Sequence, residues 1–188
     1  MARAIAGLGV SILAAMALAA CSGSSPPPPV VAPPAPPPVA APEPPPPPVV
    51  SGDQQFIDSA AAAGAAEVEA GKMASQQARS RAVKAFAARM VRDHTAANKR
   101  LAALVRHEKM TPNPPPMDTS SLAGLSGAEF DKAYMTNQVQ AHQSVIGAFE
   151  AEATGGQNAA LRKFAHNSLP MLRNHLRQAE ALAKRVGG

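Results

Sequence analysis

Residues 83–104 read VKAFAARMVRDHTAANKRLAAL, and this stretch decides the fold. Its apolar positions recur every three or four residues, at Val83, Phe86, Met90, Ala97, Leu101 and Leu104. A period near 3.6 residues predicts an amphipathic helix with one buried face. His94 lies on that same face. The run Pro112-Asn113-Pro114-Pro115-Pro116 must end the helix, because proline has no amide hydrogen to donate.

Three further stretches of the chain show the same spacing. The first begins at Asp53, its expected N-cap, and ends near Ser80. Another runs from Ser126, which should form a capping box with Glu129, to Gly155-Gly156. The last runs from about residue 157 to 186, with a kink expected at its internal proline, residue 170. Because the first and last pairs of helices have short links, we predict an all-α, up-down four-helix bundle over residues 53–186.

Residues 1–20 are predicted to be a lipoprotein signal peptide. The apolar run over residues 4–17 is too short to span a membrane. It ends in Leu18-Ala19-Ala20-Cys21, a bacterial lipobox, whose cysteine is the only one among 188 residues. Lipid on Cys21 should therefore anchor the protein to a membrane of the bacterial envelope. Since Ser22 rather than aspartate follows, we expect an outer-membrane lipoprotein facing the periplasm, with exposure on the cell surface left open. The alternative is an ordinary secretory signal with a chance cysteine.

Residues 21–52 carry the anchor and a predicted Pro-rich linker. Fifteen of the twenty prolines lie between Pro26 and Pro48, and Glu43 is the only charge in residues 22–51. Proline fixes φ and removes a backbone donor, so we expect a disordered, extended polyproline II spacer. At about 3.1 Å per residue this linker reaches roughly 90 Å. It should hold the helical domain away from the lipid surface.

The second predicted helix also carries a family resemblance, in Phe86-Ala87-Ala88-Arg89-Met90-Val91-Arg92-Asp93-His94. The later pairs Leu169-Pro170 and His175-Leu176 extend it. On these residues the chain resembles the DUF4142 family of bacterial exported proteins over about residues 53–185. The resemblance implies a ferritin-like four-helix bundle in the bacterial envelope. It implies no established activity, because a shared fold does not transfer chemistry.

Four polar residues lie on the inner faces, one on each predicted helix: Glu67, His94, His142 and His175. An unpaired buried polar group costs about 1–3 kcal/mol, so we expect these side chains to meet. If the two short turns share one end of the bundle, the first three are level and His175 lies about 9 Å deeper. We expect a hydrogen-bonded polar layer that fixes helix register. The alternative is a single bound Zn²⁺ or Fe²⁺ ion.

Other metal centres fit this sequence less well. The chain contains no Glu-x-x-His motif, which argues against a di-iron centre. Met90 and Met171 each precede an inner-face histidine by one turn, and thioether sulfur suits Cu(I). Methionine more often fills gaps in a core, so copper ranks below zinc and iron. We expect Asp93 to be a surface carboxylate, with support of a neighbouring metal ligand as the alternative. His107 and His166, which lie off the apolar faces, should be solvated.

Charge and missing motifs narrow the function classes. The net charge is +5, with basic residues recurring on the second and fourth predicted helices. An exported protein does not meet nucleic acid, so anionic lipid headgroups or lipopolysaccharide are the better partners. The chain has no Gly-rich phosphate loop, nucleophile elbow or His-Glu-x-x-His motif, so an enzyme is not expected. Two functions stay open: a non-enzymatic envelope binding or stress-related module, and a mononuclear metal-binding or redox bundle. No oligomeric state is predicted.

The lipobox predicts that membrane attachment depends on one thiol. Cys21→Ser should abolish metabolic labelling with a fatty acid and leave an uncleaved or soluble protein, because the cysteine thiol carries the diacylglycerol. Ser24→Ala, three residues away, serves as the matched control and should fractionate with membranes. Unchanged fractionation and unchanged electrophoretic mobility of Cys21→Ser would contradict the prediction.

Overall fold

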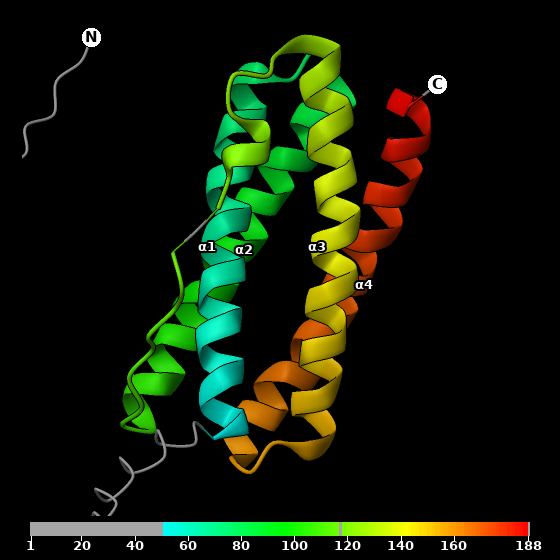
Figure 1. The fold of residues 1–188 in the computed structure, drawn as a ribbon. Coiled ribbons are helices and arrows are strands. Elements are labelled where there is room, and N and C mark those ends of the chain that lie inside the picture. The colour runs from blue at the N-terminus through cyan, green and yellow to red at the C-terminus, as the bar shows by residue number, and fades with distance from the viewer. Residues whose placement is uncertain (1–50, 117, 188) are drawn as a thin grey trace, which may run out of the picture. The chain divides into compact units, whose positions relative to one another are not determined.

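The computed structural model describes residues 51–116 and 118–187. Four helices make up most of them: α1 (Gly52–Gln77), α2 (Arg81–His107), α3 (Gly127–Gly155) and α4 (Ala159–Gly187), with a short 3-10 helix η1 (Ser120–Leu122) (Figure 1). The predicted all-α four-helix bundle is therefore confirmed. The signal peptide, Cys21 and the Pro-rich linker lie outside the described residues. In the part of the chain described, none of the helices combines the length and apolarity that a membrane crossing requires.

The long connection between α2 and α3 sets the directions of the helices. α1 packs on α2 and α3 packs on α4, and the two pairs meet through α1 with α3 and α2 with α4. In Figure 1 the chain after α2 runs back along the bundle, so α3 starts at the end where α2 starts. A bridge between Ala78 and Gly127 marks this shared end. The helices thus run up, down, down and up, with the single crossover of ferritin-like bundles.

The expectation that the two short turns lie at one end is therefore wrong. The α1–α2 turn, residues 78–80, and the α3–α4 turn, residues 156–158, lie at opposite ends of the bundle (Figure 1). The physical reason is the reach of the crossover, residues 108–126. A segment of that length spans about 60 Å when extended, which exceeds the roughly 40 Å length of α2. It can therefore return along the bundle before α3 begins.

A buried aspartate ties the α1–α2 turn to the start of α3. The Asp131 carboxylate accepts hydrogen bonds from the backbone amides of Arg79 at 3.1 Å and Ser80 at 2.8 Å. The expected capping box does not form, because the Ser126 side chain makes no cap hydrogen bond and Glu129 is exposed. Asp131, two residues further on, turns inward and caps the neighbouring turn instead.

A second aspartate ties the α3–α4 turn to the start of α1. Asp53 accepts from the amides of Gln157 at 2.7 Å and Asn158 at 2.8 Å. The expectation that Asp53 is the N-cap of its own helix is therefore wrong. Ser51 holds that position, and its hydroxyl accepts from the Gln54 amide at 3.2 Å. Each end of the bundle is thus closed by one carboxylate that bonds the backbone of another helix pair.

Two apolar clusters fill the bundle, and a polar layer separates them. The large buried side chains of one cluster lie toward the 78–80 turn: Val83, Phe86, Met90, Leu122, Phe130, Tyr134 and Met135. Those of the other lie toward the 156–158 turn: Phe56, Ile57, Leu101, Val105, Phe149, Leu161, Leu169 and Leu172. Buried alanines let the helices approach closely in both clusters. The polar side chains of the middle layer are therefore shielded from water on both sides.

The Asp131 contact predicts a specific loss of stability. Asp131→Asn removes the charge that accepts two backbone amides, and it should lower the free energy of unfolding by about 1–3 kcal/mol. Urea unfolding followed by circular dichroism measures this difference. Glu129→Gln is the matched control, an exposed carboxylate in the same turn, and should stay within about 0.5 kcal/mol of the wild type. Equal midpoints for both variants would exclude the proposed role of Asp131.

Candidate metal centre

Three buried histidines meet in the layer between the two apolar clusters. His94 of α2, His142 of α3 and His175 of α4 each place one ring nitrogen within 4.8 Å of the other two. The ring centroids are 5.5 to 5.7 Å apart. The three residues are only 6%, 0% and 1% exposed, respectively. Neutral imidazoles grouped in this way are suitable ligands for zinc, copper, iron or nickel.

Hydrogen bonds on the outer side of the group orient two of the rings. His142 Nδ1 lies 2.9 Å from the Gln138 carbonyl oxygen, and His175 Nε2 lies 2.9 Å from Asp93 Oδ2. Each acceptor places the proton on that nitrogen, so the other ring nitrogen keeps its lone pair. Those nitrogens, His142 Nε2 and His175 Nδ1, are buried and have no partner among the described residues, and the same holds for His94 Nε2. Outer hydrogen bonds of this kind commonly orient metal-binding histidines.

His175 is a full member of the group, so the expectation that it lies about 9 Å deeper is wrong. That depth was counted from an end that the two short turns were assumed to share. Counted from the end with the 78–80 turn, Glu67, His94, His142 and His175 all lie about 10 to 15 residues along their helices. At 1.5 Å per residue they differ in height by about 8 Å at most. The expected depth also placed the start of this helix near residue 157, whereas α4 begins at Ala159.

Glu67 of α1 lies beside the three histidines rather than among them. Its Oε2 accepts a hydrogen bond from Gln138 Nε2 at 2.6 Å, while its Oε1 is 3.7 Å from His142 Nδ1. That nitrogen already faces the Gln138 carbonyl. Burial raises the pKa of the Glu67 carboxyl to about 7, and the Gln138 hydrogen bond opposes this rise. The expected four-residue layer thus divides into three imidazoles with free nitrogens and one hydrogen-bonded carboxyl.

Two other residues lie at the site, and the sequence assigned neither of them to the polar layer. Asp93 was expected at the surface, and its side chain is one-third exposed, yet it bonds His175 from the neighbouring helix. The sequence did not reveal which helix packs beside α2, and only that packing gives Asp93 its partner. Tyr134 is fully buried with an unpaired hydroxyl, and burial together with the Glu67 charge raises its pKa. Its position on the inner face of α3 was the available signal.

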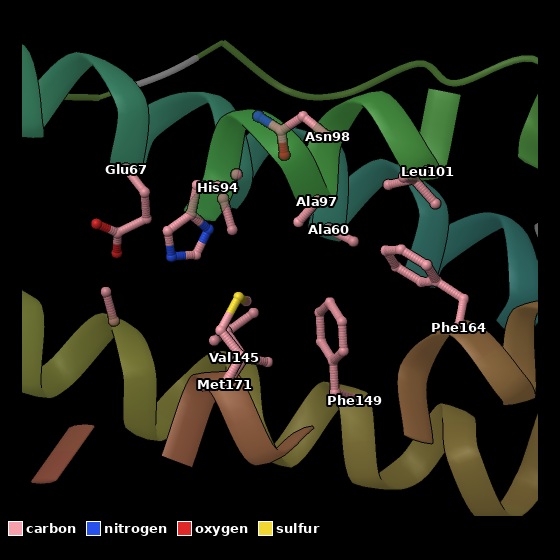
Figure 2. Close-up of a pocket in the computed structure, with 14 residues that line it drawn as sticks. Ala60, Glu67, His94, Ala97, Asn98, Leu101, Val145, Phe149, Phe164 and Met171 are labelled. Carbon is pink, nitrogen blue, oxygen red and sulfur yellow. The ribbon is translucent and has the colours of Figure 1, made fainter. Parts of the chain in front are cut away.

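A cavity of about 40 Å³ adjoins the histidines on the side of the 156–158 turn. In Figure 2 Glu67 and His94 lie at one end of it, and Leu101 and Phe164 lie at the other. Met171 of α4 lines the same cavity, whereas Met90 is fully buried in the apolar cluster above. The space is large enough for a few water molecules. The two remaining histidines, His107 and His166, are exposed, as the sequence predicted.

The chain belongs to the DUF4142 family, described as a domain of unknown function, whose family model matches residues 38–182. Among solved structures, CopM in the Cu(I)-bound form is similar, with a TM-score of 0.64 and 19% identity, over 72% of this chain and 98% of that one. CopM co-crystallised with Ag gives 0.63 and 20%, over the same shares. A DUF305 fragment from Deinococcus radiodurans gives 0.64 and 13%, over 74% of this chain and 99% of that fragment. At these identities the likeness establishes a shared helical-bundle fold. No curated protein matches the chain in sequence.

The buried histidines predict how the stability of the metal-free protein depends on pH. Burial lowers the pKa of His94 to about 3 and that of His142 to about 4, and it also lowers the pKa of His175. Unfolded histidines titrate near pH 6.5. Below that pH the unfolded chain binds protons that the folded chain does not, so the free energy of unfolding falls as pH drops toward 4.

Glu67 acts in the opposite direction. With its pKa raised to about 7, its contribution is complete below about pH 4.5 and is lost as pH rises through 7. Below pH 6.5 the proton uptake of three unfolded histidines changes the free energy of unfolding more than the single Glu67 carboxyl does. The stability of the metal-free protein should therefore peak near pH 6.5. Urea unfolding between pH 4.5 and 8 measures the profile, and His142→Asn should flatten its acid side while His166→Ala leaves it unchanged. A stability that is constant or rises toward pH 4.5 would refute the prediction.

Proposed function

We propose that this domain binds one copper ion, as Cu(I), through His94, His142 and His175. The observation that carries the proposal is the convergence of three buried ring nitrogens without hydrogen-bond partners. An unpaired buried acceptor costs about 1–3 kcal/mol, and coordination of a single ion satisfies all three at once. Two of the rings donate outer hydrogen bonds, to the Gln138 backbone carbonyl and to the Asp93 carboxylate, and these bonds hold them in the tautomer that binding needs.

The charge of the site favours a monovalent ion. All three imidazoles are neutral, and the cost of moving an ion out of water increases with the square of its charge. A divalent ion such as Zn²⁺ requires compensation, which Glu67 supplies only when it loses its proton. Imidazole is a suitable copper ligand, and Met171, which lines the same cavity as His94, offers a thioether that suits Cu(I). This reverses the order expected from the sequence, in which zinc and iron preceded copper.

The structural relatives support the choice of metal. CopM, which resembles this chain in fold, has been solved with Cu(I), with Cu(II) and with Ag bound. The choice of Cu(I) over Cu(II) rests on the neutral, buried imidazoles of this chain. A bundle of this architecture thus accommodates ions of the kind proposed, while the ligands named here follow from the geometry of this chain alone.

We place this copper-binding domain in the bacterial envelope, as a non-enzymatic, lipid-anchored protein of the outer membrane. The lipobox ending at Cys21 supports the anchor, and the proline content of the following residues supports an extended tether. Arg89, Arg92 and Arg185 border one groove between α2 and α4. That grouping of positive charge supports contact with anionic headgroups in the same compartment.

Titration of the untagged protein with Cu(I), in competition with a chromophoric chelator under anaerobic conditions, tests the proposal. One equivalent should bind per chain. His142→Ala and His175→Ala should each weaken binding by at least about a hundredfold, because each removes one of three ligands. His107→Ala and His166→Ala are matched controls at exposed positions and should bind like the wild type. Bound copper should also raise the free energy of unfolding, by about 2.7 kcal/mol at a free concentration one hundred times Kd.

Several results would contradict the proposal. The first is an absence of stoichiometric Cu(I) binding to the wild type. The second is one equivalent still bound after all three histidines are replaced, which would locate copper elsewhere in the chain. The third is a clear preference for Zn²⁺ over Cu(I) under matched buffering, which would retain a metal site but exclude the proposed ion.

A further inference from the structure

The proposed copper ligands are out of reach of solvent in the folded bundle. His142 and His175 are almost completely buried, and His94 is 6% exposed. Apolar clusters close the bundle above and below them. An ion therefore reaches these nitrogens only if a side chain between them and the surface moves. The identity of that side chain is a separate question, which rests on the copper site proposed above.

A surface groove between α1 and α3 approaches the site from outside. Its outer wall is rich in side-chain oxygen atoms from the crossover segment and α3: Asp118, Thr119, Ser121, Asn137 and Gln140. Its inner wall contains Glu67 and Gln138. Oxygen atoms, including one exposed carboxylate, attract a cation toward this inner wall.

Glu67 separates this outer groove from the inner cavity. It is the acidic residue that borders both spaces, and its carboxyl also lies 3.7 Å from the His142 ring. Its 2.6 Å hydrogen bond with Gln138 joins α1 to α3 and closes the gap between the two helices. Figure 2 shows Glu67 beside His94 at the end of the cavity. Ala141 also borders both spaces, but its methyl group cannot swing aside, whereas the Glu67 side chain can rotate.

The cavity has a second boundary with the surface, between α1 and α2, and this boundary is closed more tightly. Asn98 borders both the cavity and a groove on that face. Its side chain packs directly against Gly64, where a Cβ would clash with Asn98 Oδ1. That outer groove is lined by both Lys99 and Glu69, so its charge does not distinguish the two sides. The tight packing of Asn98 against Gly64 therefore favours the Glu67 side.

We propose that Glu67 and Gln138 form a gate through which the ion passes between the α1–α3 groove and the three histidines. When the Glu67 side chain leaves Gln138, the barrier between the groove and the cavity beside His94 opens and the ion passes. The hydrogen bond closes again once the ion has passed. A gate changes the energy barrier for ion movement but not the energies of the free and copper-bound protein. Weakening the gate therefore raises the rates of uptake and release together, while Kd stays nearly constant.

The experiment measures copper transfer in both directions. Stopped-flow absorbance follows release of Cu(I) from the loaded full-length protein to a chromophoric chelator, and uptake from a weak Cu(I) complex. Gln138→Ala and Glu67→Ala, which remove opposite halves of the hydrogen bond, should each raise both rates at least about tenfold. Glu67→Gln retains a hydrogen-bonding amide and should stay near the wild-type rates. Asn98→Ala, on the other face of the cavity, is the matched control and should not accelerate transfer.

The readouts separate the gate from the copper site. If the wild type binds no Cu(I), the proposed function fails and the gate fails with it. If the wild type binds Cu(I) while the variants keep its rates, or change Kd without changing release, the gate is refuted and the copper site stands. Faster copper transfer in Asn98→Ala would also refute the gate, because it would indicate that the ion passes between α1 and α2. Helical circular dichroism identifies which of the two gate variants fold, and one folded variant is enough for the comparison.

Discussion

The unpaired nitrogens of three buried histidines impose the constraint around which the middle of this bundle is organised. Apolar clusters above and below the histidines remove water as a partner for them. The outer nitrogens of two rings are satisfied by a backbone carbonyl and by the Asp93 carboxylate, and one buried nitrogen of each of the three rings has no partner among the described residues. Unpaired buried nitrogens lower the stability of the folded protein unless a bound ion coordinates them. The chemistry of the site therefore depends on the exclusion of water by the two apolar clusters as well as on the three imidazoles.

Helix direction sets which helix ends lie together. Asp53 and Asp131 each bond the backbone of a turn in another helix pair, which fixes the opposite ends of the bundle. With α3 starting beside the α1–α2 turn, the three histidines lie about 12 to 15 residues from that end. The cap contacts, although far from the site, therefore take part in building it.

The groups around the histidines connect the site to the surface on two sides. Asp93 bonds His175 and lies 3.9 Å from Arg89, which borders a basic groove between α2 and α4. Glu67 and Gln138 connect the site to the oxygen-rich groove between α1 and α3. A carboxyl group thus stands on each side between the neutral imidazoles and solvent.

The sequence by itself determined the four helices, their approximate limits, the family, and the choice of inward-facing polar residues, because each of these depends on periodicity and local chemistry along one chain. It assigned Glu67, His94, His142 and His175 to one layer. Only the tertiary structure decided that the three histidines form a group, that Glu67 bonds Gln138 beside them, and that Asp93 supports His175. The physical reason is that the long crossover leaves the direction of α3 and α4 open, and that direction sets which side chains share a depth. Contacts between helices such as Asp53 with the 156–158 turn are invisible to periodicity, since both partners look like ordinary caps until the helices are packed together.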